Sequence, residues 1–184
     1  MELLILFIIC LLSAVVGFSF YQRHGLPGFG DKNQFVRSIP LLLLLGALMT
    51  ILSYLLFDRY FIKLSPSSYP KNLLYLLSFP LKAAFTEEVI LRFSLVTIGV
   101  GIFRSRVAGV VLAAAVAALF TLKYFQFVGI SVGFNYLMVT QFLLSFTASL
   151  ILGYLFVSRG LLYAMALNFL FGMKYLIVSL LPSC

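Results

Sequence analysis

Long, nearly unbroken runs of apolar residues constrain this chain more than any other feature. Residues 3–20 and 39–57 contain no charged side chain, and similar runs follow at 107–127, 137–157 and 161–181. A transmembrane α-helix needs about 20 such residues, and the runs do not alternate with the period of two typical of strands. The pattern therefore predicts an all-α protein, a polytopic transmembrane helix bundle.

The composition excludes several other classes of protein. Hydrophobic residues make up 63% of the 184 residues and charged residues 10%, where soluble domains have roughly 45–50% and about 25%. A soluble domain of this size still exposes about a third of its chain surface to water. A soluble enzyme, a disordered chain, a coiled coil and a secreted disulfide scaffold are thus excluded, and we expect residues 1–184 to form a single integral membrane domain.

The formal charge of +8 comes from 13 basic and five acidic residues. Basic residues gather in the loops of membrane proteins, so the charge does not predict a nucleic-acid partner. The two cysteines, Cys10 and Cys184, have no close Cys or His neighbour. We therefore expect no metal and no other cofactor.

The first half of the chain predicts two spans with polar connections. A retained helix over 3–20 is followed by a polar loop at 21–38 and a second span at 39–57. Pro40 falls in the first turn of that second span, where proline is tolerated. The residues 58–71 are expected to form the next polar loop.

Residues 72–103 are too long for one simple crossing. As a single helix they would extend about 48 Å, against about 30 Å for the hydrocarbon core. Pro80 is expected to split them into a short interfacial or re-entrant piece up to about 79 and a spanning helix from about 81. The count is six spans, or seven if the first piece also crosses.

The second half predicts three further spans, at about 107–127, 137–157 and 161–181. Residues 128–136 are expected to form a loop and 158–160 a tight turn. Lys123 and Lys174 lie in these spans, and we expect their long side chains to extend to the membrane interface.

The helix expected after Pro80 contains Lys82 and, within six positions of one another, three further charged residues: Glu87, Glu88 and Arg92. On a helix, Glu88 and Arg92 share a face, whereas Glu87 points about 100° away from Glu88. A charge at the bilayer centre costs about 2.5–3.5 kcal/mol on insertion scales. These side chains must therefore face the bundle interior or a cavity, and they form a candidate functional site.

Two interpretations of this cluster remain open from the residues alone. Glu88 and Arg92 can simply neutralise each other, with Lys82 or Arg104 balancing Glu87, and so fix helix packing. Alternatively, a carboxylate in an apolar cavity can take a proton from water and act as a general base.

The segment Glu87-Glu88-x-x-x-Arg92, followed by Phe93, resembles the first motif of the CAAX-protease and bacteriocin-processing (CPBP) family of intramembrane proteases. Type II CAAX prenyl endopeptidases belong to this family. The resemblance covers roughly 72–175 and implies a CAAX-protease-like core. It also implies that the first glutamate activates water, assisted by two histidines and an asparagine on later helices, with no clear metal requirement.

The later motifs match by position more than by identity. Phe120 matches the second motif, but Tyr124 stands where the family has its first histidine. Asn168 stands for the second histidine and Gly172 for the asparagine, and the single histidine of the chain, His24, lies in the first polar loop. The catalytic set implied by the resemblance is Glu87, Glu88, Arg92, Tyr124 and Asn168, in which Tyr124 and Asn168 can donate hydrogen bonds to an oxyanion but are poor proton carriers.

Two functions follow from the resemblance. The missing histidines favour a catalytically impaired relative, a pseudoenzyme that serves as a membrane subunit or binds a peptide, a lipid or a partner helix. The alternative is an active glutamate-dependent intramembrane endopeptidase, a hydrolase of membrane-associated or prenylated peptides. In both cases we expect a multi-pass integral membrane protein, and the family favours a prokaryotic cell membrane. The expected partners are the lipid bilayer and a protein partner or membrane complex, with a peptide substrate in the second case.

Overall fold

The computed structural model describes residues 2–64, 72–127 and 136–176, and these residues form helices and connections without any strand. The all-α prediction is therefore confirmed for the described chain. Its elements are α1 (Glu2–Phe20), α2 (Lys32–Ser53), η1 (Tyr54–Asp58), α3 (Arg59–Leu64), α4 (Leu73–Glu87), η3 (Glu88–Val96), α5 (Thr97–Phe103), α6 (Arg106–Phe127), α7 (Tyr136–Arg159) and α8 (Leu161–Gly172), where η marks π-helical segments.

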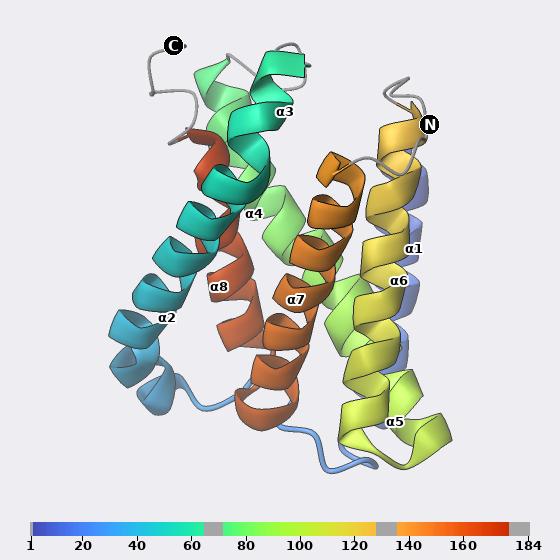
Figure 1. The fold of residues 1–184 in the computed structure, drawn as a ribbon. Helices are drawn as coiled ribbons and strands as arrows, with labels where there is room; N and C mark the ends of the chain where they lie inside the picture. The colour runs from blue at the N-terminus through green and yellow to red at the C-terminus, as the bar shows by residue number, and fades with distance from the viewer. Residues whose placement is uncertain (1, 65–71, 128–135, 177–184) are drawn as a thin grey trace.

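Several of these elements join end to end, so that α2, η1 and α3 form one long helix and α4, η3 and α5 another. The resulting helical segments run alternately up and down the bundle (Figure 1). In that view α7 lies in front, α4 passes behind it, and α1 lies behind α6. The end of α8 and the short α3 lie at one end of the bundle, while the α1–α2 and α5–α6 connections lie at the other.

Two helical stretches are long and apolar enough to cross a membrane, Lys32–Leu64 and Tyr136–Arg159. Leu4–Phe20, Arg106–Leu122 and Leu161–Leu176 are apolar but shorter. Large apolar side chains also point outward around the bundle, among them Leu4, Phe7, Leu44, Leu81, Leu119 and Tyr154. Such an outer surface is suited to lipid, and it weakly supports membrane insertion.

The core is built around η3 and the helices that enclose it. Val96, Phe156, Ala164 and Leu167 are completely buried. Phe93 on η3 packs edge-on against Phe156, with ring centroids 6.3 Å apart. Because η3 also carries Glu88 and Arg92, this packing fixes the backbone that presents the charged cluster.

Pro80 does not split the helix that contains it, so the predicted re-entrant piece is wrong. The chain is helical from Leu73 through Phe103, with Pro80 inside α4. The proline ring is fully buried and lies against Gly172, where a Cβ atom would come within 2.9 Å of it. Packing from α8 therefore holds the helix together where one backbone hydrogen bond is lost.

The predicted loop at 58–71 is also wrong over its first part, because the helix continues through η1 and α3 to Leu64. The loop predicted at 21–38 ends earlier, since the Asp31 side chain accepts a hydrogen bond from the backbone N–H of Asn33 and begins α2 there. Pro40 consequently lies inside α2, beyond its first turn.

The tight turn predicted at 158–160 is reduced to one residue. Gly160 adopts a φ of +111°, a conformation that side-chain-bearing residues avoid. The N–H of Leu161 then donates to the Gly28 carbonyl at 2.8 Å, which ties the start of α8 to the α1–α2 connection. The predicted loop at 128–136, except Tyr136, and residues 177–181 of the last predicted span lie outside the described residues.

Candidate functional site

Glu88 and Arg92 form a buried ion pair on η3. Arg92 Nη1 lies 3.4 Å from Glu88 Oε1, and the side chains are only 2% and 0% exposed. Arg92 Nη2 also donates to Ser149 Oγ on α7 at 3.1 Å. The sequence prediction of a shared face for Glu88 and Arg92 is thus confirmed. Both residues lie on a π-helical segment, a feature often found at functional sites.

Asn168 on α8 joins the two carboxylates. Its Nδ2 donates to Glu88 Oε1 at 2.8 Å and lies 3.3 Å from Glu87 Oε2. Glu87 and Glu88 diverge on their own helix, but they converge on this single amide of a helix 80 residues away. Four of the five predicted site residues (Glu87, Glu88, Arg92 and Asn168) therefore lie together.

The cluster is left incomplete. Glu88 Oε2 and Arg92 Nε are buried and have no hydrogen-bond partner. Glu87 is exposed, and within the described ranges its carboxylate forms no ion pair. Lys82 and Arg104 do not balance it, so that part of the packing interpretation is wrong. With both carboxylates ionised, Glu87, Glu88 and Arg92 together carry one net negative charge.

The remaining positions compared with the CPBP motif are Tyr124 and Gly172. Tyr124 lies on α6, but its side chain falls outside the described residues. Gly172 has no room for an asparagine, because Pro80 occupies the space where its side chain would begin. His24 lies in the α1–α2 connection. Its ring stacks on Phe20, with ring centroids 6.4 Å apart, and lies against Gly101 on α5.

A second buried cluster, which the sequence did not predict, lies where η1 meets the end of α8. Lys174 Nζ lies 3.3 Å from Asp58 Oδ1 and donates to Ser53 Oγ at 2.9 Å. The Ser53 hydroxyl in turn donates to Asp58 Oδ2 at 2.7 Å. Lys174 also lies 5.0 Å from the ring centroid of Phe171. Asp58 and Lys174 are both buried. The expectations that Asp58 lies in a loop and that Lys174 reaches the interface are therefore wrong.

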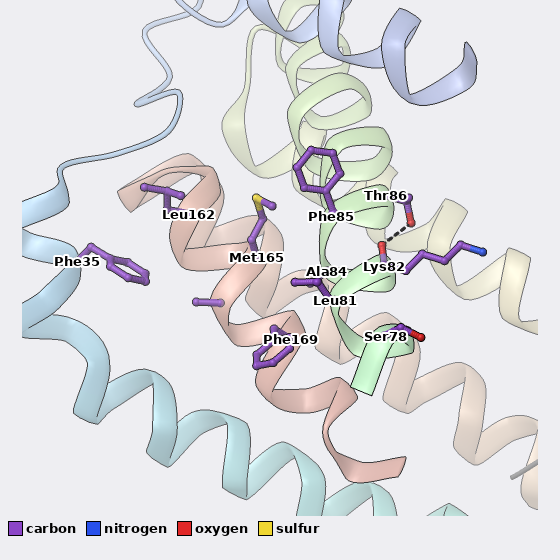
Figure 2. A pocket seen from close by; sticks show the side chains of 11 residues that line it. Phe35, Ser78, Leu81, Lys82, Ala84, Phe85, Thr86, Leu162, Met165 and Phe169 are labelled. Atoms are coloured by element: carbon purple, nitrogen blue, oxygen red, sulfur yellow. Dashed lines mark hydrogen bonds between the residues drawn. The ribbon is translucent and has the colours of Figure 1, made fainter. Parts of the chain in front are cut away.

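An open apolar groove of about 700 Å³ runs between α4, α8 and the start of α2 (Figure 2). Leu162, Met165 and Phe169 line it from α8, facing Leu81 and Phe85 on α4. Lys82 and Thr86 lie at its edge, and the Lys82 ammonium points away from α8 in Figure 2. Phe85 and Glu87 differ by about 200° around α4, so these two side chains leave that helix on opposite faces.

The two carboxylates could hold a cation, but they do not make a typical transition-metal site. In the part of the chain that the structure describes, no three His, Cys, Asp or Glu side chains gather as metal ligands would. The chemistry that remains is binding by carboxylates and an amide, or activation of water by Glu87.

Comparisons of this chain with protein-family models, with curated proteins and with solved structures find no match. The resemblance to the CPBP family accordingly rests on the motif residues of the sequence and stays a prediction.

Proposed function

We propose that this chain is a multi-pass membrane protein whose helices form a CAAX-protease-like core. The helical segments alternate in direction (Figure 1), and apolar side chains cover the outside of the bundle. The segments include three apolar helices besides the two that are long enough to cross a bilayer. A bundle with six crossings places the Glu87 cluster between the helices, where intramembrane charges in such proteins lie.

We further propose that the cluster binds a partner chain and does not hydrolyse it. The observation that carries this proposal is the Asn168 amide, which occupies the position of a family histidine and donates to both carboxylates. Neither an amide nor Gly172 can move a proton. Loss of a general acid–base group typically lowers the rate by 10²–10⁴-fold, and two histidines are absent here. The chain then acts as a subunit that holds a peptide or a partner helix at the site its relatives use for catalysis.

The active endopeptidase is the rival function, and the exposed Glu87 is the feature that favours it. In that mechanism Glu87 takes a proton from water, while Tyr124 and Asn168 donate hydrogen bonds to the oxyanion. The two functions differ in what a Glu87→Gln variant loses. A protease loses turnover, whereas a binding subunit loses its partner.

The test begins with gentle purification of the chain from its native membranes, followed by mass spectrometry of the intact particle. We expect a stoichiometric partner that the Glu87→Gln variant no longer retains and that the Thr86→Val variant keeps. Cleavage of membrane peptides is assayed on the same samples, and we expect none. Turnover that depends on Glu87 refutes the binding function and establishes the protease.

A further inference from the structure

The charged cluster lacks positive charge, and one of its buried oxygens lacks a hydrogen-bond donor. Glu88 is completely buried, and its Oε2 accepts no hydrogen bond. Glu87 receives one long hydrogen bond, from Asn168 at 3.3 Å. On α7 the side-chain oxygen of Gln141 is also buried and unpartnered. Within the cluster the unpaired buried atoms are thus one oxygen, Glu88 Oε2, and one donor, Arg92 Nε, while two carboxylates face a single cation.

The basic side chains near the bundle interior are already engaged. Arg92 is paired with Glu88, and Lys174 with Asp58. Arg159 donates to Ser38, and Arg106 to the Gly25 carbonyl. Within the described residues, therefore, no cation of the chain neutralises Glu87. A carboxylate without a countercharge is costly in an apolar environment.

A polar track on α7 starts at the cluster. Ser149 accepts from Arg92, and Ser145, one turn earlier, pairs with Thr121 on α6 at 2.9 Å. Gln141 lies one further turn along, about 12 Å from Ser149. Residues four apart share one face of a helix, so the face that contacts Arg92 stays polar over two turns. These side chains are neutral, so the track adds no charge that could balance the carboxylates.

We infer that the exposed Glu87 carboxylate, at the edge of this negatively charged cluster, binds one cationic side chain, a lysine or an arginine, of the partner segment. This inference rests on the proposed function and adds the chemistry by which the partner is recognised. An ammonium or guanidinium group supplies three or five donors together with the missing positive charge. A charge-assisted hydrogen bond is about twice as strong as a neutral one. An otherwise apolar segment with a single basic residue fits the site.

The test uses the full chain in lipid nanodiscs and two synthetic helical probes that differ at one central residue, arginine or glutamine, in a leucine–alanine background. Binding is measured by fluorescence energy transfer. We expect the arginine probe to bind at least tenfold more tightly than the glutamine probe. Glu87→Gln should remove that preference, whereas the neighbouring Thr86→Val should keep it. Glu87→Lys should transfer the preference to a probe with a central glutamate.

The outcomes separate the two claims. Equal binding of both probes overturns charge recognition and leaves partner binding intact. Stabilisation of the protein by sodium or ethylammonium salts, without any gain from the arginine probe, assigns the site to a free cation and also overturns the inference. Glu87-dependent cleavage of the probes overturns the proposed function itself.

Discussion

Two buried charge clusters lie among the described residues of this bundle, and they differ in how fully their polar atoms are paired. Asp58, Lys174 and Ser53 form a closed set, in which the ammonium donates to the serine and the carboxylate and the serine hydroxyl also donates to the carboxylate. In the other cluster Glu88 keeps an unpartnered oxygen, and Glu87 is exposed beside it. Each cluster connects a π-helical segment to α8 or to the residues that follow it.

The difference separates a structural role from a functional one. A buried pair whose polar atoms are all satisfied fixes the packing of its helices and leaves nothing for a ligand to contact. An incomplete buried cluster costs free energy unless something else completes it. The Asp58 cluster therefore explains how the end of α8 is held against η1. In the Glu87 cluster, the exposed Glu87 carboxylate has no ion-pair partner among the described residues, so a partner chain can contact it.

Arg92→Ala should have the largest effect on stability. It leaves the Glu88 carboxylate buried without its cation, and it opens a cavity beside Ser149. Removing one partner of a buried pair costs about 3–5 kcal/mol. We expect little folded protein by size-exclusion chromatography in detergent. Arg59→Ala, at an exposed position on α3, serves as the control and should purify normally. A well-folded Arg92→Ala protein contradicts the buried pairing.

Lys174→Met should be nearly as damaging, although methionine preserves much of the side-chain volume. Asp58 loses its cation and Ser53 loses the donor that it accepts from, at a cost of about 3 kcal/mol. The double variant Asp58→Asn/Lys174→Met should recover most of that loss, because no buried charge remains. Thermal unfolding of the single and double variants measures the difference. A double variant no more stable than Lys174→Met refutes the closed structural pair.

The two clusters also show how far the sequence predicts this structure. The spacing of Glu88 and Arg92 in an apolar run was sufficient to predict that they share a face, because residues four apart are neighbours on one helix. Their pairing was one of the two interpretations left open. The Asp58 cluster was missed because Lys174 lies 116 residues from Asp58 and 121 from Ser53, and nothing local links it to them. The one available signal was Tyr60-Phe61-Ile62, an apolar stretch just after Asp58 that favours continuation of the helix.

The interpretation of Pro80 failed for a related reason. Proline ends helices by local rules, but here the packing of its ring against Gly172 overrides them. Neither residue alone indicates this contact, since α4 and α8 meet only in the folded bundle. The helix boundaries that local signals do control, such as the end of α1 at Phe20 and the turn at Gly160, were predicted closely.

Gly172→Asn introduces the residue that the CPBP motif has at the corresponding position, and it should have an intermediate effect. Its Cβ would come within 2.9 Å of Pro80, and overpacking of this kind costs about 1–3 kcal/mol. We expect a lower melting temperature and no gain of peptidase activity. Gly153→Ala is a matched control for crowding at another helix crossing, because a Cβ atom at Gly153 would lie 2.7 Å from Val110 Cγ1. Activity gained by Gly172→Asn contradicts the view that Pro80 closes this position.

Glu87→Gln should change stability least, and it completes the comparison of the two clusters. Glutamine has almost the same shape as glutamate, and its side-chain carbonyl can still accept from Asn168. The position is exposed, so no buried charge is left unpaired, and we expect the melting temperature to move by less than about 2 °C. Asp58→Asn, the equivalent change in the closed cluster, should lower it clearly, because Lys174 then remains buried without its carboxylate. Melting curves of both variants in one detergent make the comparison, and a large loss at Glu87 with none at Asp58 reverses the roles assigned to the two clusters.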